Sequence, residues 1–172
     1  MRRSTLACAL LAAACGGAGP AATTAPTAEA PPSRGAIELT LRLSDGTFLD
    51  IGELRGEPIL LFVFATFDGV SQAVLRPLRA LARRHPELRI VGIAAQPNAR
   101  LLIGPYEEAL EPPFLVAYDP EDTVVQGTSM LGAIDAVPTF IVLDRHGRPV
   151  ARDVGFVDEA RLRELVSAAG VR

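Results

Sequence analysis

Hydrophobic and polar residues from position 36 onward follow patterns that predict an α/β fold. Apolar and polar side chains alternate over 37–43, as in a strand with one buried face. Residues 59–65 form a continuous apolar run, which is typical of a strand covered on both faces. Together with the turn signals between them, such segments predict strands at 37–43, 47–51, 59–65, 88–94, 114–118, 140–143 and 149–155.

Helical patterns alternate with these strands. They predict helices at 71–84, 98–110, 123–131 and 158–169. In the first of these, Val74, Leu78 and Leu81 form an apolar stripe, and its arginines lie mostly opposite, on a face that we expect to be solvated. We expect Asn98 to cap the second helix and Pro105 to break or kink it. The order of elements predicts a mixed central sheet with helices on both faces and an N-terminal β-hairpin.

The N-terminal residues have the pattern of an export signal. Arg2 and Arg3 precede a short apolar run that is too short to span a bilayer. We therefore predict a signal peptide at 1–14. The sequence Leu-Ala-Ala-Ala-Cys-Gly at 11–16 resembles a bacterial lipobox, which implies that Cys15 is lipidated, although the small residues also fit an ordinary secretory cleavage.

The residues that follow predict a tether and a single folded domain. Residues 15–35 are rich in Ala, Pro, Thr and Gly and show no apolar periodicity, so they bury too little surface to fold alone. Residues 36–172 are long enough to form a hydrophobic core without disulfides or metals. We therefore expect a folded domain at 36–172, held away from a membrane by an extended linker.

Composition and charge exclude several classes of function. The chain has 17 basic residues, all arginine, against 20 acidic ones, so its net charge of −3 gives no reason to expect nucleic acid binding. Its two cysteines, Cys8 and Cys15, both precede the folded domain. The domain therefore has no thiol that could attack a disulfide or bind a soft metal, and we expect no metal and no cofactor.

Four segments of the domain carry a resemblance to a known family. They are Leu-Arg-Gly-Glu-Pro-Ile-Leu-Leu-Phe at 54–62, Phe-Ala-Thr-Phe-Asp-Gly-Val-Ser at 64–71, 113–120, and Val-Pro-Thr-Phe-Ile-Val-Leu-Asp-Arg-His-Gly at 137–147. In this order and spacing the chain resembles the membrane-tethered thioredoxin-like proteins of the TlpA/ResA type, within the redoxin (AhpC/TSA-like) group. The resemblance covers nearly the whole domain and implies a thioredoxin-like fold.

The same resemblance shows where the redox chemistry has been lost. It implies two redox cysteines at the start of the helix that follows 59–65, and Asp68 and Ser71 occupy those positions here. Pro77 lies six residues after Ser71, one more than in the family, so Gln72 is an alternative for the second position. Neither alignment supplies a thiol. Asp68 is instead expected to cap the helix.

A second site element implied by the resemblance is a cis peptide bond before Pro138. In such folds the backbone next to this proline pairs with an extended peptide, which requires no cysteine. We therefore predict a binding site formed by Phe67, Asp68, Gly69, Val137 and Pro138. The alternative, that Pro138 only shapes a loop, remains open.

Other chemistry finds little support in the sequence. A serine nucleophile at Ser71 would need a neighbouring base, and we expect both histidines, His85 and His146, to lie far from it. The acidic residues between the predicted strands at 114–118 and 140–143 are expected to form a solvated loop rather than a cation site; they are Asp119, Glu121, Asp122 and Asp135.

We therefore expect a tethered, redox-inactive thioredoxin-like protein that binds an envelope protein or peptide, and no enzyme. Its expected location is the periplasmic face of the cell envelope as a lipoprotein. Gly16 is not an acidic retention signal, which favours the outer membrane. The alternatives are a soluble secreted or periplasmic protein, a thiol-disulfide oxidoreductase or peroxiredoxin-like antioxidant protein, and a domain with no remaining activity.

Overall fold

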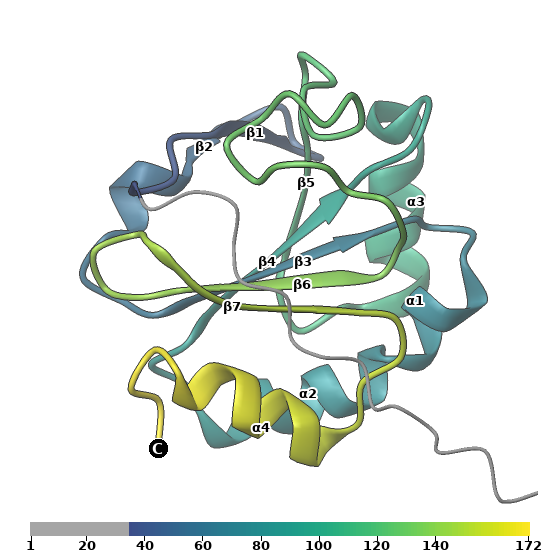
Figure 1. Ribbon diagram of the computed structural model, residues 1–172. Coiled ribbons are helices and arrows are strands. Elements are labelled where there is room, and N and C mark those ends of the chain that lie inside the picture. Colours follow the sequence, from purple (N-terminus) through teal and green to yellow (C-terminus); the bar gives the residue numbers. More distant parts are fainter. Residues whose placement is uncertain (1–34) are drawn as a thin grey trace, which may run out of the picture.

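All seven predicted strands are present in the computed structural model, which describes residues 35–172 (Figure 1). They form one sheet in the order β2-β1-β5-β4-β3-β6-β7. The sheet is mixed: β3 is parallel to β4 and antiparallel to β6, and β1 and β2 form the predicted N-terminal hairpin. The strands are β1 (Thr40–Leu43), β2 (Phe48–Asp50), β3 (Ile59–Phe64), β4 (Arg89–Ala94), β5 (Leu115–Tyr118), β6 (Thr139–Leu143) and β7 (Pro149–Val154).

The central strand β3 is buried on both faces, as its continuous apolar run predicts. Each of its six side chains is fully buried. Because successive side chains point to opposite faces of a strand, β3 contributes to two separate clusters of the hydrophobic core. Leu60, Phe62 and Phe64 enter one cluster, and Ile59, Leu61 and Val63 enter the other.

The α-helices cover one face of this sheet (Figure 1). The helices are η1, a 3₁₀ helix (Ile51–Leu54), α1 (Gly69–Ala73), α2 (Leu75–Arg84), α3 (Ala99–Leu110) and α4 (Glu159–Ser167). Buried side chains of α2, α3 and α4 all belong to the cluster that contains Phe62. The mixed α/β class is confirmed. The prediction placed helices on both faces, but within residues 35–172 the second face is covered by η1, by the chain around Ile37 and by residues 119–138, and not by an α-helix.

The prediction of a helix at 123–131 is wrong. The buried carboxylate of Asp119 accepts hydrogen bonds from the Glu121 N–H at 2.9 Å, the Val124 N–H at 2.8 Å and the Thr123 hydroxyl at 2.6 Å. Such side-chain bonds to the local backbone stabilise turns at the expense of a helix. The segment still buries Val124 and Leu131. These two residues have the spacing expected for one face of a helix, but a series of turns brings them into the core.

A buried arginine fixes the far end of this segment. Arg152 of β7 is 7% exposed and donates to the carbonyl oxygen of Leu131 at 3.0 Å and to that of Ala133 at 2.5 Å. These bonds satisfy two backbone carbonyl groups that would otherwise need another partner. Residues 119–138 are therefore held by local bonds of Asp119 at one end and by long-range bonds of Arg152 towards the other.

The other helices differ from the prediction only in detail. The predicted helix at 71–84 is divided into α1 and α2 at Val74, because Pro77 has no N–H to donate to the Ala73 carbonyl. Asn98 does occupy the N-cap position of α3, but its side chain makes no capping bond. Pro105 lies inside α3 and does not interrupt it.

Four aromatic rings form the centre of the helix-covered core. The Phe62 ring lies 5.0 Å from that of Phe64 and 5.3 Å from that of Phe140, and Phe114 packs edge-on against Phe62 at 5.6 Å. Offset and edge-on pairs at these distances stabilise a core beyond the effect of area burial alone. Within residues 35–172, Phe62, Phe64 and Phe140 are the largest of the fully buried side chains.

Gly92 of β4 makes room for this aromatic cluster. A Cβ atom at Gly92 would lie 2.6 Å from the Phe114 ring and 3.2 Å from the Phe64 ring. Both distances are shorter than a normal contact between carbon atoms. The sequence shows a glycine in an apolar run, but the reason for it is visible only once Phe114 is seen to fold over β4.

The predicted N-terminal segments cannot be compared with the structure. The signal peptide at 1–14, Cys15 and nearly all of the linker at 15–35 lie outside the described residues. Among residues 35–172, no helix combines the length and the apolar composition that a membrane span needs.

Replacing Gly92 by alanine tests the aromatic packing. We expect Gly92→Ala to lower the free energy of unfolding by about 1–3 kcal/mol, because the Phe114 ring must move. Urea denaturation gives the value. Gly104→Ala in α3 is the matched control, since a Cβ there meets no atom within 4 Å and alanine favours a helix. Equal stability of Gly92→Ala and the unmodified chain would contradict the packing described.

Candidate binding site beside the turn after β3

The turn that follows β3 is closed by a contact between Asp68 and Ser71. Asp68 is the N-cap of α1, and its carboxylate accepts hydrogen bonds from the Ser71 N–H and from the Ser71 hydroxyl, both at 2.7 Å. The bond from the hydroxyl lowers the pKa of the Asp68 carboxyl below its ordinary value. Ser71 is fully buried. The predicted capping role of Asp68 is confirmed.

Two glutamines hold the same turn from outside. Gln96 follows β4 and is 3% exposed; its amide oxygen accepts from the Thr66 N–H at 2.5 Å and its amide nitrogen donates to the Thr66 hydroxyl at 2.9 Å. Gln72 of α1 donates to the Thr66 carbonyl at 2.9 Å. The backbone of Thr66 is thus bonded on both sides, which makes the turn rigid. Gln96 was not predicted as a site residue. Its only signal in the sequence is that it is a polar residue shortly after a buried strand.

The segment around Pro138 lies at the same end of the sheet. Thr139 pairs with Val63 of β3 on one side and with Val154 of β7 on the other, so these three residues form a row across three strands. The Val137–Pro138 peptide bond is cis, as expected. Pro138 is buried and its carbonyl accepts from the Gly155 N–H at 2.8 Å. The predicted site segments, 67–69 and 137–138, therefore both lie just beyond this row.

Exposed apolar side chains gather beyond the same row. Phe67 is 73% exposed and Val70 42%, on the turn and on α1, and Val154 at 44% and Phe156 at 62% lie at the end of β7. We call these four residues the Phe67 surface. Phe156 was missed from the sequence, where it is simply an aromatic residue after a glycine at the end of a strand.

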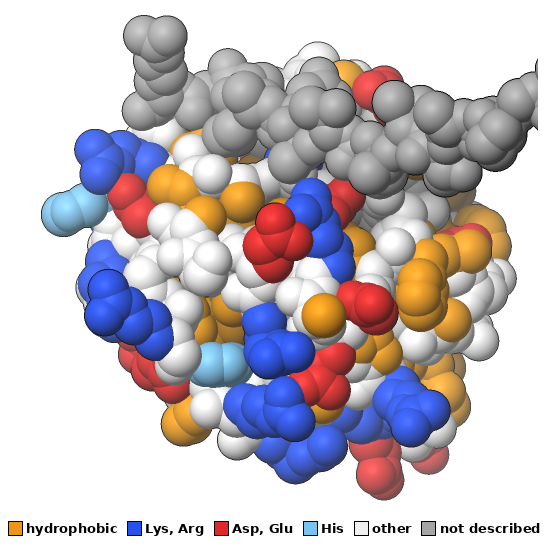
Figure 2. Space-filling model, turned by 60° about the horizontal axis from the view of Figure 1, so that its bottom comes forward, with side chains coloured by type: hydrophobic (Ala, Val, Ile, Leu, Met, Phe, Trp, Pro, Cys, Tyr) orange, Lys and Arg blue, Asp and Glu red, His pale blue; other side chains and the backbone are white. Residues whose placement is uncertain are grey.

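A cavity extends the Phe67 surface towards α2. It has a volume of about 360 Å³ and lies between Phe156 and the exposed side of the helix. Its lining residues are Arg76, Pro77, Ala80, Arg83, Phe156, Asp158 and Glu159. Figure 2 shows the face formed by α2 and α4, on which arginines gather with carboxylates between them. Among them, Arg84 forms an ion pair with Glu159, which supports a solvated face for this helix.

Neither histidine lies beside Ser71: His85 is bonded to Glu87 next to the C-terminus of α2, and His146 lies in the turn between β6 and β7, at the opposite end of the sheet. Residues 35–172 contain no group of three or more side chains arranged to hold a metal ion. The expectation that the acidic loop is solvated is wrong for Asp119, which is buried and fully bonded.

The geometry also favours one of the two alignments of the lost cysteines. The side chains of Asp68 and Ser71 touch, as two residues joined by a disulfide must. Gln72 is exposed and directed to the Thr66 carbonyl. Ser71 therefore corresponds better than Gln72 to the second cysteine position.

Comparison with known proteins supports the fold. DsbF of Mycobacterium tuberculosis, solved in mixed oxidized and reduced forms, superimposes with a TM-score of 0.66 at 21% identity, over 77% of this chain and 96% of that one. A secreted disulfide oxidoreductase of the same organism gives 0.62 at 20%, over 76% and 96%. An exposed lipoprotein thioredoxin of Streptococcus pneumoniae gives 0.62 at 16%, over 76% and 98%. The chain therefore has the thioredoxin-like fold found in these thiol-disulfide oxidoreductases.

Comparison of the amino-acid sequence alone finds no match. No family model matches the chain. No curated protein matches it either. The resemblance inferred from the four sequence segments is confirmed by the shared fold of the solved structures.

Restoring the two thiols tests the geometry of the turn. We expect Asp68→Cys with Ser71→Cys, in a chain that also carries Cys8→Ser and Cys15→Ser, to form a disulfide under mild oxidation, because the two side chains already touch. Titration of free thiols measures it. The pair Asp68→Cys with Gln72→Cys is the control and should stay mainly reduced. Free thiols in the first variant and a disulfide in the second would refute the assignment of Ser71.

Removing the Asp68 carboxylate tests the cap. We expect Asp68→Ala to cost about 1 kcal/mol of unfolding free energy at pH 7. The pKa of this carboxyl is lowered in the folded chain, so its contribution is complete above the ordinary pKa and is lost as the pH falls through the lowered value. The difference between variant and unmodified chain should therefore shrink below about pH 4.

Urea denaturation between pH 7 and pH 2.5 measures this difference. Asp158→Ala removes the cap of α4, where the carboxylate accepts from the Arg161 N–H at 2.8 Å without a hydroxyl donor, and serves as the matched control. A loss for Asp68→Ala that is the same at every pH would contradict the role given to the carboxylate.

Proposed function

We propose that this chain is a redox-inactive thioredoxin-like protein that binds a protein or peptide segment at the Phe67 surface. The observation that carries the proposal is the contact between Asp68 and Ser71, which occupies the positions where a redox pair would lie. Disulfide exchange requires a thiolate that attacks a sulfur atom. A carboxylate and a buried hydroxyl cannot form the mixed disulfide, and residues 36–172 contain no cysteine.

The surface beside this turn has the properties of a recognition site. Phe67 and Phe156 expose most of their rings at the same end of the sheet, although four other phenylalanines of the chain are buried or partly buried in the core. Exposed aromatic side chains grouped in this way mark protein interaction sites. The bonds from Gln96 and Gln72 fix the turn in advance, so binding does not have to order it.

An extended segment suits the strand ends at this site. Pro138 comes just before β6 and Gly155 just after β7. The Gly155 N–H donates a hydrogen bond to the Pro138 carbonyl, so the two residues are neighbours at this end of the sheet. A partner in extended conformation could place alternate side chains against Phe67 and Phe156. Strand-like recognition of this type gains affinity from main-chain bonds and specificity from alternate side chains.

The N-terminal sequence supports a location in the cell envelope. A lipid on Cys15 and the Pro-rich linker after it would hold the domain at a membrane, with the outer membrane favoured by Gly16. Two proteins of the same fold are described as secreted and as an exposed lipoprotein. Their export is consistent with the same location for this chain.

A second candidate function is thiol-disulfide oxidoreduction. The fold shared with such enzymes favours it. It would require a thiol supplied by another molecule, since the folded domain has none. Trapping of a mixed disulfide on the chain would support this candidate, and the proposal of a binding protein predicts none.

Site-specific photo-cross-linking tests the proposed surface. We expect p-benzoylphenylalanine at position 67 or 156, introduced into the chain in its own cells, to give a discrete adduct with an envelope protein. Position 115 is the control, because Leu115 is also exposed but lies at the opposite end of the sheet. Phe67→Ala should then lower the affinity for the identified partner about tenfold or more.

The Phe67→Ala variant is informative because its side chain is mostly exposed, so its loss leaves the core intact. Adducts from position 115 in equal yield, or unchanged affinity of Phe67→Ala for the identified partner, would refute the proposed surface.

A further inference from the structure

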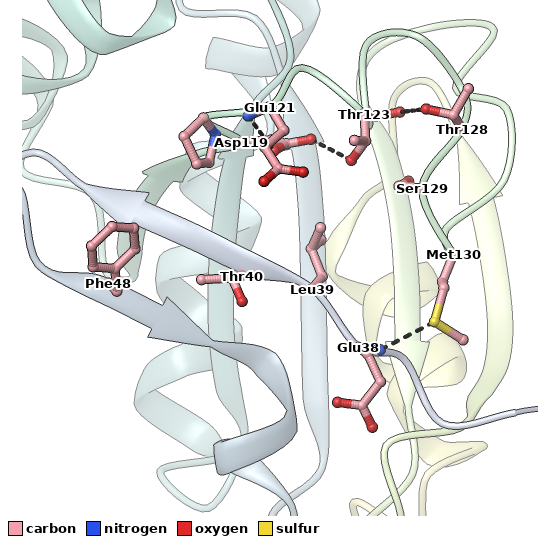
Figure 3. Close-up of a pocket in the computed structure, with 11 residues that line it drawn as sticks. Glu38, Leu39, Thr40, Phe48, Asp119, Glu121, Thr123, Thr128, Ser129 and Met130 are labelled. Atoms are coloured by element: carbon pink, nitrogen blue, oxygen red, sulfur yellow. Dashed lines mark hydrogen bonds between the residues drawn. The ribbon is translucent and has the colours of Figure 1, made fainter.

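A second cavity lies between β1 and the turn-rich segment that follows β5 (Figure 3). It has a volume of about 330 Å³, within the range of sites that hold a ligand. It shares no lining residue with the Phe67 surface or with the cavity next to it. Its lining residues are Glu38, Leu39, Thr40, Phe48, Asp119, Pro120, Glu121, Thr123, Thr128, Ser129 and Met130.

The backbone of β1 is left open at this cavity. Leu39 bonds towards β2 through the Ile51 N–H, so the neighbouring residue Thr40 directs its N–H and carbonyl to the other side, towards β5. The ladder between β1 and β5 ends at the pair formed by Arg42 and Tyr118. The next position opposite Thr40 is Pro120, which has no N–H, and within residues 35–172 no backbone bond joins the two.

The next N–H along this edge has only a weak acceptor. The Glu38 N–H points to the sulfur of Met130 at 3.5 Å, and a thioether sulfur is a poor acceptor compared with a carbonyl oxygen. Thr40 and Glu38 thus present one side of a strand to the cavity with its hydrogen bonds unfilled or weakly filled. An open strand edge of this type accepts an additional strand.

The charged side chains around the cavity are all acidic. Glu121 is exposed, with no ion pair among the described residues, whereas Glu38 is bonded to Arg55 and Asp119 is committed to its own turn. No arginine or histidine lines the cavity. Arg55 and Arg42 lie near the cavity, but they are engaged by Glu38 and by the Phe48 ring. The carboxylate of Glu121 therefore favours a basic occupant.

Apolar groups flank the same opening. Phe48 is 61% exposed and Met130 40%, and Figure 3 shows Phe48 and Thr40 on neighbouring strands, with Glu121 above them. The guanidinium of Arg42 already lies 4.5 Å from the centre of the Phe48 ring. This contact shows that the ring can pack against a basic side chain.

From these observations we propose that the cavity receives an extended protein segment that carries an arginine or lysine. The segment pairs with the open edge at Thr40, replaces the weak Met130 contact with a carbonyl acceptor, and places its basic side chain beside Glu121. Apolar side chains on either side of it pack against Phe48 and Met130. This site is separate from the Phe67 surface and does not depend on the function proposed for it.

A designed peptide tests the proposal directly. The probe is acetyl-Val-Arg-Val-Arg-Val-amide, titrated into the purified, isotope-labelled chain and followed by the amide resonances. We expect saturable shifts at Glu38, Thr40 and Glu121. The same peptide with glutamate in place of arginine, and the arginine peptide with an N-methylated central residue, should bind at least about fivefold more weakly, since each loses one of the two recognition elements.

Reversal of the charge of Glu121, at the edge of the cavity, tests the same contact from the side of the protein. We expect Glu121→Arg to weaken binding of the arginine peptide about tenfold, because an attraction becomes a repulsion. Glu108→Arg on the exposed face of α3 makes the same change in net charge and should leave the affinity unchanged. Amide spectra of both variants establish that they are folded, and Phe67→Ala should bind this peptide normally.

The proposal is overturned if the arginine peptide does not bind, if its shifts lie away from Glu38 and Thr40, or if the glutamate peptide binds equally well. Equal losses in Glu121→Arg and Glu108→Arg would also overturn it, since they would indicate a general effect of charge. None of these results would affect the photo-cross-linking at positions 67 and 156, so the two proposals fail or survive separately.

Discussion

The Asp68 carboxylate accepts both the N–H and the hydroxyl of Ser71, and the exit of the chain from the sheet depends on that contact. β3 is buried on both faces, so the chain must leave it through a tight turn before α1 can cover one face. A cap at this point satisfies helix N–H groups that would otherwise be unpaired. Gln96 and Gln72 add bonds to Thr66, so polar side chains hold the turn together with the backbone bond from the Asp68 N–H to the Ala65 carbonyl.

The proposed function uses the fold without disulfide exchange. Three solved structures share the thioredoxin-like fold of the chain, and the start of α1 is closed here by a carboxylate and a hydroxyl. At this end of the sheet the rings of Phe67 and Phe156 are exposed beside the rigid turn. A second opening, at the edge of β1, has the opposite character, with carboxylates and unfilled backbone bonds. A fold of this kind can support different functions through different surfaces.

The sequence predicted the elements that depend on local pattern. The continuous apolar run of β3, the alternation of β1 and the capping residue Asp68 each carry their own signal, and all are confirmed. Residues 119–138 were mispredicted because their shape depends on bonds from Asp119 and from distant Arg152, which leave no periodic pattern. Phe156 and Gln96 were missed for the same reason: Gln96 reaches the turn only because β4 pairs with β3, and Phe156 only because β7 pairs with β6 and β6 with β3.

The central claim is that the folded domain has no redox activity of its own. It is tested most directly by measuring the reduction of insulin by dithiothreitol in the presence of the chain carrying Cys8→Ser and Cys15→Ser, which has no thiol. The account predicts the rate of dithiothreitol alone, whereas the variant in which Asp68 and Ser71 are also replaced by cysteine provides the positive control. Acceleration of insulin reduction by the thiol-free chain would contradict the account.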